Sequence, residues 1–459
     1  MRIPPRPPTW HESCSDRGVL DEMLRHAQNP GFRAYVRRAN EAYWTWDEVR
    51  SHQPPSGVTL KAVWLAIKMA RLAATTYPTE FNDTKGQQFW FGVHSWMMHS
   101  LHEIDMDLGG TIGGLSPEPG APERERYLIR SLMEEAIASS QIEGAVVTRS
   151  EAKEMLKTGR KPRTRDEQMV LNNYRTISWL RDQKNEPLSK SLLFEIHRRI
   201  TEDTLDNPSA AGRFRVPSER VRVIDERDNE IIHDPPAAQE LDDRFAKLCA
   251  FANDAKASEP FLHPVIRAII LHFWLAYDHP FVDGNGRTAR ALFYWYMLRS
   301  GYWLFEFLSI SRIVAKAPAQ YVRAFLNTET DEADLTYFIL FNLRIVQRAR
   351  KELQDYLESQ RTRNAELTGL LRAHPNLNHR QRALLTHAIR HQTALYSIES
   401  HRSSHGVTYE TSRTDLADMA ERGLLLEHKI ERRLHYAVPA DLPELLRGNP
   451  KRTRARRRR

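Results

Sequence analysis

The chain has 459 residues and a hydrophobic content of 41%, which is ordinary for a folded protein of roughly two to four domains. No apolar run reaches the ~18 residues that a membrane-spanning helix needs, and the first residues lack the apolar core of a signal peptide. We therefore expect a cytoplasmic protein that does not contact a membrane. Two cysteines are too few for a disulfide framework or a cysteine-based metal site.

The net charge of +8 arises mainly at the C-terminus, where residues 451–459 carry seven positive charges and no acid. We expect this basic tail, within residues 441–459, to be disordered. Its charge fits nonspecific binding to nucleic acid or to another acidic surface. It fits equally a solvated tail without a defined partner.

The chain begins with a proline-rich, polar stretch, residues 1–30, which we expect to be disordered. Residues 31–122 indicate an N-terminal helical region and a linker. Apolar residues recur at helical spacing over 58–73, and residues 108–122 are rich in Gly and Pro. The aromatic segment 43–47 is typical of a core or of a docking face, and we assign it no chemistry.

A helix is predicted over residues 123–144, and polar residues gather at its end. Ser139 and Glu143 lie four positions apart, so they share one face of the helix. Gly144 follows them as a typical C-terminal cap. From these residues alone, Glu143 is either a surface carboxylate before the cap or a charged group presented to a neighbouring site.

Two short β-prone runs around a polar turn predict a hairpin over residues 221–233. Helices are predicted before it, over 166–182 and 192–200, and after it, over 264–277. Spacing alone favours an ordinary structural hairpin.

A loop rich in glycine and charge, residues 279–290, connects two apolar runs that lack Pro and Gly and predict buried helices. Gly284 and Gly286 bracket Asn285, which lets backbone N–H groups approach a ligand closely. The second helix begins here, so its unpaired N–H groups and the positive end of its dipole favour an anion such as phosphate.

Charged side chains surround this helix start. Arg287 and Arg290 lie three positions apart and can face one ligand. Asp283 can bind a divalent cation in the usual Mg²⁺–phosphate arrangement. His279 is the side chain here whose ordinary pKa suits proton transfer near neutral pH. A plain loop with solvated charges accounts for any one of these residues, but not for the whole set.

The loop resembles the signature of the Fic family, H-x-F-x-(D/E)-G-N-G-R-x-x-R. Every fixed position of the signature is present, namely His279, Phe281, Asp283, Gly284, Asn285, Gly286, Arg287 and Arg290. The resemblance implies a Fic domain over residues 123–345, a helical bundle in which the predicted hairpin is a flap. Residues 139–144 resemble the family's inhibitory motif, (S/T)-x-x-x-E-(G/N), which implies the class whose inhibitory helix precedes the Fic core.

The resemblance implies a protein adenylyltransferase that transfers AMP from ATP to a Ser, Thr or Tyr hydroxyl of a target protein. In that reaction His279 would accept the hydroxyl proton and Asp283 would hold Mg²⁺. The implied nucleotide-binding residues are Gly284, Asn285, Gly286, Arg287 and Arg290. The resemblance also implies that Glu143, with Ser139, inhibits the enzyme by drawing Arg290 away from the γ-phosphate, and that the target segment pairs with the flap backbone.

Residues 346–370 predict a charged linker helix, and residues 371–440 predict a separate domain. Two short helices across a Gly-containing turn, followed by two strand-like runs, fit a helix-turn-helix with a wing. The segment resembles the winged-helix domains of bacterial regulators, a fold that serves DNA binding and also protein–protein contact. The residues implied to face DNA bases are Thr411, Ser412 and Arg413.

Together these expectations describe a mainly α protein: a Fic-type helical bundle with a β-hairpin flap, an N-terminal helical region and a C-terminal winged helix-turn-helix. The expected cofactors are ATP and Mg²⁺. The expected partners are ATP and a target protein at residues 221–233, with DNA and a second copy of the chain as further candidates. The alternative function is a DNA-binding transcriptional regulator whose Fic core senses a nucleotide.

Overall fold

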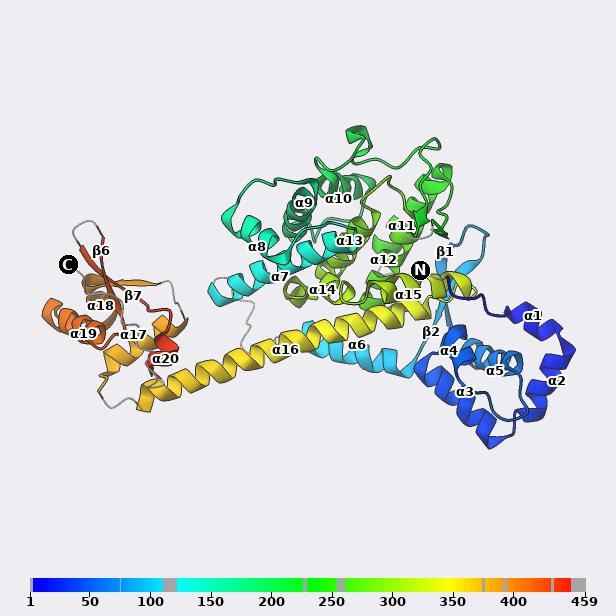
Figure 1. The fold of residues 1–459 in the computed structure, drawn as a ribbon, viewed down its shortest axis with the longest axis horizontal. Helices are drawn as coiled ribbons and strands as arrows, with labels where there is room; N and C mark the ends of the chain where they lie inside the picture. Colours follow the sequence, from blue (N-terminus) through cyan, green and yellow to red (C-terminus); the bar gives the residue numbers. More distant parts are fainter. Residues whose placement is uncertain are drawn as a thin grey trace. The chain divides into compact units, whose positions relative to one another are not determined.

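The computed structural model describes residues 3–74, 76–109, 122–225, 229–253, 261–373, 376–390, 394–430 and 433–446. Most of the predicted basic tail, residues 447–459, lies outside the described residues, as does most of the predicted linker at 108–122. The chain divides into two compact units, residues 1–118 with 127–351 and residues 119–126 with 352–459 (Figure 1).

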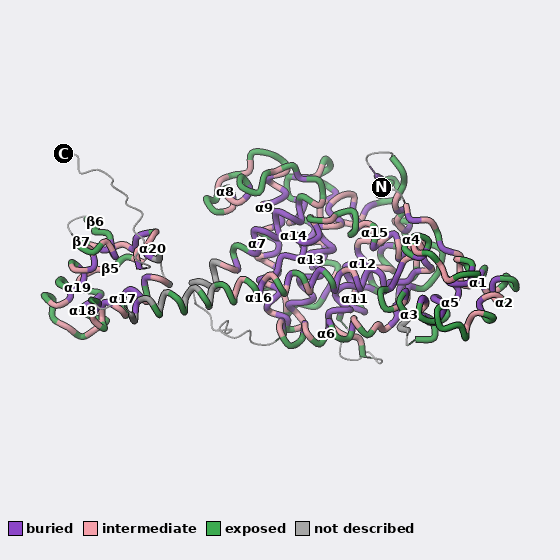
Figure 2. Tube along the Cα trace, turned by 60° about the horizontal axis from the view of Figure 1, so that its bottom comes forward, coloured by how far each residue is buried: buried purple, intermediate pink, exposed green. Residues whose placement is uncertain are grey.

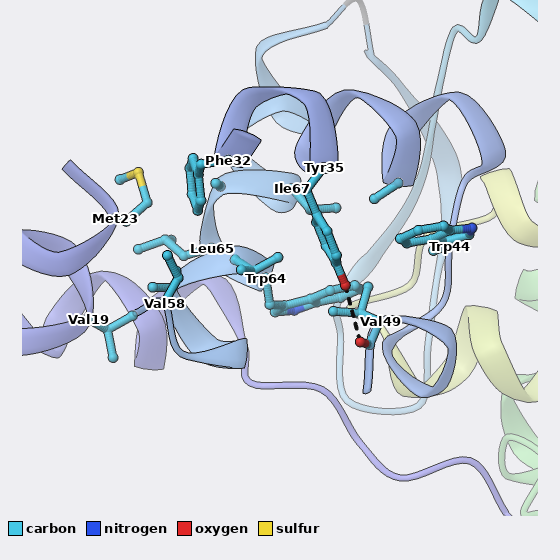
Figure 3. Packing of buried hydrophobic residues seen from close by; sticks show 14 residues of the cluster. Val19, Met23, Phe32, Tyr35, Trp44, Val49, Val58, Trp64, Leu65 and Ile67 are labelled. Carbon is cyan, nitrogen blue, oxygen red and sulfur yellow. Dashed lines mark hydrogen bonds between the residues drawn. The ribbon is translucent and has the colours of Figure 1, made fainter. Parts of the chain in front are cut away.

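The first unit opens with a group of five helices. They are α1 (Trp10–Ser15), α2 (Arg17–His26), α3 (Pro30–Ala42), α4 (Trp46–Ser51) and α5 (Leu60–Ala73). The prediction that residues 1–30 are disordered is therefore wrong. Thr9 caps α1 and Asp16 caps α2, each accepting a backbone N–H. Val19 and Met23 lie on one face of α2 and are buried in the core of Figure 3, which anchors a helix whose overall composition is polar.

An antiparallel hairpin that we did not predict follows these helices. Its strands are β1 (Thr76–Asn82) and β2 (Gln88–Gly92), and α6 (Ser95–Leu108) comes next. Phe81 of the hairpin stacks on Trp274, with ring centroids 4.4 Å apart. Trp90 donates its N–H to the carbonyl of Ala333 over 3.2 Å and accepts the N–H of Leu335 over 2.8 Å. The hairpin thus joins the N-terminal helices to the rest of the first unit.

The remainder of the first unit is a helical bundle. The helices that form it, wholly or in part, are α7 (Pro122–Ile142), α8 (Arg149–Thr158), α9 (Arg165–Leu180), α10 (Lys190–Thr201), α11 (Leu241–Asn253), α12 (Pro264–Asp278), α13 (Asn285–Arg299), α14 (Ile310–Val314), α15 (Pro318–Thr330) and α16 (Thr336–Ala373), with 3₁₀ turns at 208–210, 238–240 and 303–307. Residues 122–126 of α7 and 352–373 of α16 belong to the second unit. α12 and α13 are buried over nearly their whole length, as the purple tube in Figure 2 shows. A helix surrounded by other helices must be largely apolar on every face. This holds for α12 and for α13 from Ala291 on, whereas the first turns of α13 bury polar side chains.

The predicted hairpin within 221–233 is confirmed. Strands β3 (Val223–Ile224) and β4 (Ile231–His233) pair antiparallel. Ile224 lies opposite Ile231, and these two side chains remain 47% and 43% exposed. The flap therefore presents apolar side chains that its own fold does not cover.

The second unit contains a small sheet and several helices. After the end of α16 come α17 (His379–Arg390), β5 (Leu395–Ser397), α18 (Ile398–His405), α19 (Tyr409–Glu421), β6 (Leu426–Ile430), β7 (Arg433–Ala437) and α20 (Leu442–Leu446). The strands form an antiparallel sheet in the order β5-β7-β6. Leu385, Leu416 and Tyr436 lie in its core. Across the described part of the chain, no helix combines the length and the apolar character that a membrane crossing requires.

Candidate active site

The loop between α12 and α13 is fixed at its start by unusual backbone geometry. His279 ends α12 in the left-handed conformation, with φ of 44°. A buried arginine, Arg215, holds this turn from outside. Its backbone N–H donates to the carbonyl of Pro280 over 2.8 Å, and its Nε donates to the carbonyl of His279 over 2.9 Å. These two hydrogen bonds therefore fix the direction in which the loop leaves α12.

The middle of the loop is closed by Asn285. Its Oδ1 accepts the N–H of Phe281 over 2.9 Å, and its Nδ2 donates to the carbonyl of Phe281 over 2.8 Å. We predicted that Asn285 binds nucleotide, and the structure places its side chain in the loop's own hydrogen bonds. Phe281 is fully buried and stacks on His197, with ring centroids 3.7 Å apart and planes at 5°.

His197, on α10, is a residue that sequence reasoning missed. Its Nδ1 accepts the N–H of Gly212 over 2.9 Å, so its Nε2 carries the proton and donates to the carbonyl of Asp283 over 2.9 Å. Burial lowers the pKa of His197 to about 4, so the ring is neutral at physiological pH. Nothing in the local sequence marks this histidine, because its partners lie in two distant loops.

Two glycines allow the start of α13 to pack closely. Gly284 has φ of 82°, and a Cβ there would lie 2.8 Å from Cγ2 of Thr201. A Cβ on Gly286 would lie 2.2 Å from Oε1 of Glu143. The second glycine thus leaves the space into which the Glu143 carboxylate reaches, next to the N-terminus of the helix.

Asp283 lies at the edge of the loop with its carboxylate 41% exposed. Oδ1 accepts the N–H of Gly284 over 2.5 Å and lies 3.4 Å from Nη2 of Arg287, while Oδ2 lies 3.4 Å from Nη2 of Arg165. Among the described residues there is no group of three or more metal-ligating side chains. Mg²⁺ commonly uses one or two carboxylates and completes its shell with phosphates and water, so a single exposed aspartate fits this ion.

The two signature arginines differ in their hydrogen-bond partners. Arg287 is almost completely buried, and its Nη1 donates to the carbonyl of Ile200 over 3.2 Å. Arg290 is held by the end of α7. Its Nε donates to Oγ of Ser139 over 2.9 Å, and its Nη2 donates to the carbonyl of Ser139 over 2.9 Å and to Oε1 of Glu143 over 3.0 Å.

His279 is arranged to accept a proton at one nitrogen. Its Nδ1 lies 3.3 Å from the carbonyl of Ala276, which can only accept, so the neutral ring carries its hydrogen on Nδ1 and leaves Nε2 as the basic atom. Burial, with a smaller contribution from the nearby His233, lowers the pKa of His279 to about 4. The neutral, proton-accepting form therefore dominates near pH 7.

A second missed residue, Glu135, ties α7 to α13. Its carboxylate accepts from the hydroxyl of Tyr294 over 2.9 Å, from the N–H of Ser311 over 2.9 Å and from Oγ of Ser309 over 3.1 Å, and it also accepts from Oγ of Ser311. Burial raises the pKa of Glu135. These bonds fix the position of α7 along α13, and hence where Glu143 meets Arg290.

Comparison with known proteins defines the class of this site. Residues 187–297 match the Fic/DOC family, so the chain contains a Fic domain. A solved Fic family protein from Desulfovibrio desulfuricans shares its fold, with a TM-score of 0.52 and 20% identity over 78% of this chain and 99% of the other.

Two curated relatives carry the same region. The chain is 38% identical over 121 residues to the protein adenylyltransferase Fic of Nematostella vectensis, covering 26% of this chain and 25% of the relative. It is 32% identical over 123 residues to the protein adenylyltransferase fic-1 of Caenorhabditis briggsae, covering 27% and 22%. The match thus spans about a quarter of the length of these relatives.

The structure also places the three residues predicted to face DNA. Arg413 is exposed on α19, and Thr411 is partly buried with its Oγ1 2.9 Å from that of Thr408. Ser412 is completely buried, so its predicted contact with bases is wrong. Successive helix residues point about 100° apart, so three in a row cannot all face outward on a helix that packs on a core.

Proposed function

We propose that the first unit is a protein adenylyltransferase, which transfers AMP from ATP to a Ser, Thr or Tyr hydroxyl of a target protein. The observation that carries this proposal is the gathering of His279, Asp283 and Arg290 around the N-terminus of α13, with Arg290 held by Glu143. The names of the curated relatives support the same chemistry.

The phosphates of ATP would lie against the start of α13, where unpaired N–H groups and the helix dipole favour negative charge. Arg287 would stabilise the charge that develops at the α-phosphate, and Arg290 would hold the γ-phosphate. Asn285 contributes by shaping the loop and directing its amides, since both polar atoms of its side chain already bond to Phe281. Catalysis is then mostly positioning and electrostatics.

The proton of the target hydroxyl would pass to Nε2 of His279 as the hydroxyl oxygen attacks the α-phosphorus. The bond between the α-phosphorus and the bridging oxygen breaks, so AMP joins the hydroxyl and pyrophosphate leaves. The lowered pKa of His279 keeps this nitrogen free to accept the proton.

We propose that Asp283 holds Mg²⁺. The ion would neutralise charge on the phosphates when bound. The carboxylate must then exchange its contacts with Arg165 and Arg287 for the ion, which its partial exposure permits.

The flap is proposed to hold the target. A short antiparallel hairpin can accept an extended segment by backbone pairing at its edge, which gives affinity with little demand on sequence. The exposed Ile224 and Ile231 supply apolar contact for that segment.

Inhibition in cis is proposed to arise from Glu143. Its bond to Arg290 occupies the guanidinium that the γ-phosphate needs, and the carboxylate reaches into the space beside Gly286. Both effects would misplace the nucleotide rather than remove any reacting group.

The test of this function compares donors labelled at different phosphates. Glu143→Gly protein is incubated with Mg²⁺ and a lysate, using ATP labelled at either the α- or the γ-phosphorus, with His279→Ala/Glu143→Gly as control. The expected result is α-label that appears with Glu143→Gly and not with the double variant, while the γ-label is the same with both. A γ-label that is higher with Glu143→Gly than with the double variant, or equal α-labelling by the two, would contradict the proposal.

For the second unit we propose DNA binding through α19, led by the exposed Arg413. A fluorescent random duplex at low salt measures this. The affinity of the native chain should fall several-fold in Arg413→Ala, while Ser412→Ala should bind DNA like the native chain where it folds. Equal affinity of native chain and Arg413→Ala would favour a protein partner for this unit.

A further inference from the structure

His233, the last residue of flap strand β4, has acceptors at both of its ring nitrogens. Nε2 lies 2.7 Å from the backbone carbonyl of Tyr277, and Nδ1 lies 2.8 Å from Oε2 of Glu329. A carbonyl oxygen has no hydrogen to donate, and an ionised carboxylate has none either. A ring that bonds to both must donate twice, which only the positively charged imidazolium can do.

These two bonds connect three elements. His233 lies on the flap, Tyr277 is in the last turn of α12, and Glu329 is near the end of α15. The side chain of His233 is buried, and its ring lies 4.7 Å from that of Tyr277 between centroids. Because Tyr277 is only two residues before His279, the flap is fastened directly beside the base.

The charged groups around His233 favour its protonated form. Burial alone would lower the pKa of His233, but Glu329, the hydrogen bonds to Glu329 and Tyr277, and Asp278 together raise it above the ordinary value. Asp278 is itself bound by Arg244, whose Nε lies 2.6 Å from Oδ1. Burial raises the pKa of Asp278 to about 6.

The charge of His233 in turn acts on His279. After burial, it is the largest influence that lowers the pKa of His279, with Arg215 adding to the effect and Glu143 opposing it. Two neighbouring positive charges repel each other, so the charged flap residue disfavours protonation of His279.

We propose that His233 is a positioning residue that, as an imidazolium, clamps the flap to the ends of α12 and α15 and presents its positive charge to His279. This inference rests on the proposed adenylyltransferase function for its role in catalysis. As a consequence, the side chain of His233 sets both the position of the flap, where the target segment docks, and the protonation of His279.

The first experiment observes the rings directly and needs no activity. The full-length protein is labelled with ¹⁵N-histidine, and the ring nitrogens are followed by NMR from pH 4 to 9. His233→Gln and His279→Ala assign the two signals. We expect both ring nitrogens of His233 to carry a hydrogen at pH 7, and the titration of His279 to move to higher pH in His233→Gln.

Two further variants sharpen this result. Glu329→Gln leaves the histidine in place but removes its charged partner, so it should also shift the His279 titration upward and it covers the case in which His233→Gln does not fold. Asp242→Asn removes the exposed pair of Asp242 with Lys190, 2.5 Å long, on elements to which neither His233 nor Glu329 belongs, and should leave the titration unchanged. A neutral His233 at pH 7, or an unmoved His279 titration in both His233→Gln and Glu329→Gln, overturns the proposal.

The second experiment measures AMP transfer in the Glu143→Gly background. Adding His233→Gln should lower kcat/KM for a target by about 10- to 100-fold, as misplacement of reacting groups does. It should also move the acid limb of the pH profile to higher pH, which a merely structural role would not do. If no variant transfers AMP, the proposed function fails, while the ring titrations still decide whether the clamp exists.

Discussion

Gly284 lies where backbone conformation and packing both exclude a side chain. Its φ is 82°, and a Cβ would meet Thr201 at 2.8 Å. We expect Gly284→Ala to lower the free energy of unfolding by about 1–3 kcal/mol, measured by urea titration. The matched control is Gly159→Ala, which has φ of 68° but open space around it and should lose only about 1 kcal/mol. Equal losses would show that packing at Gly284 is unimportant.

His197 makes stability depend on pH in a defined direction. Its pKa is about 4 in the folded protein, against 6.5 ordinarily, so between these values the unfolded chain binds more protons. Its contribution is therefore present above pH 6.5 and is lost as the pH falls toward 4, to the extent of about 3 kcal/mol. In urea titrations from pH 7 to 4, the native protein should lose more stability than His197→Gln, by about that amount. Parallel losses would contradict this assignment.

The residues of the 279–290 loop could be predicted from the sequence, but the distant residues that hydrogen-bond to the loop could not. Phe281, Gly284 and their neighbours form a contiguous pattern that can be recognised without a structure. His197 and Arg215 act on that loop from positions more than sixty residues earlier. Their roles depend on which carbonyl groups they meet, and a single sequence does not contain that information.

Helix α7 brings Glu143 to Arg290, so we expect the position of this helix to set the state of the site. Glu135 accepts four hydrogen bonds from α13 and the segment 309–311. A glutamine in its place would present N–H groups to some of those donors. We expect Glu135→Gln to lower the unfolding free energy by about 1–3 kcal/mol and to raise basal AMP transfer, because Glu143 would engage Arg290 less often.

The control for this prediction lies one residue earlier. Glu134 pairs instead with Arg149 and Lys153 of α8, so Glu134→Gln should leave basal transfer low. Increased transfer in both variants would mean that any loosening of α7 suffices. Unchanged transfer in Glu135→Gln would show that Glu143 finds Arg290 without this support.

Elements with strong periodicity were predictable, and elements defined by distant contacts were not. The two apolar runs around the loop became α12 and α13. The hairpin of β1 and β2 was missed because Trp90 completes its backbone bonding with Ala333 and Leu335, far along the chain. The proline content of the first thirty residues predicts disorder, but Thr9 and Asp16 cap two helices there.

Across the first unit, a buried ion pair ties the N-terminal helices to the helical bundle. Lys68 lies on α5, and its Nζ is 2.8 Å from Oδ1 of Asp331, with both side chains almost completely buried. Lys68→Met would leave Asp331 without this partner, so we expect a loss of about 3–5 kcal/mol in urea unfolding. Lys61→Met, at an exposed position on the same helix, should have little effect. A small loss for Lys68→Met would mean that Arg71 compensates.

The sequence predicted the N-terminal helices and the Fic core as separate regions, whereas the structure joins them in one unit. Lys68 and Asp331 are 263 positions apart, and charged residues are ordinarily assigned to the surface. Their pairing becomes apparent only when the helices are packed.

If Glu143 restrains an otherwise complete transfer site, removing it should raise the rate of transfer. This rate is the initial rate of label transfer from α-labelled ATP with Mg²⁺, measured for the native protein and for Glu143→Gly. A charge-assisted hydrogen bond contributes roughly 1.5–3 kcal/mol, so the variant should be faster by about 10- to 100-fold. Equal rates would contradict restraint by Glu143, and no transfer by either protein, with other nucleotide donors also inactive, would contradict the adenylyltransferase itself.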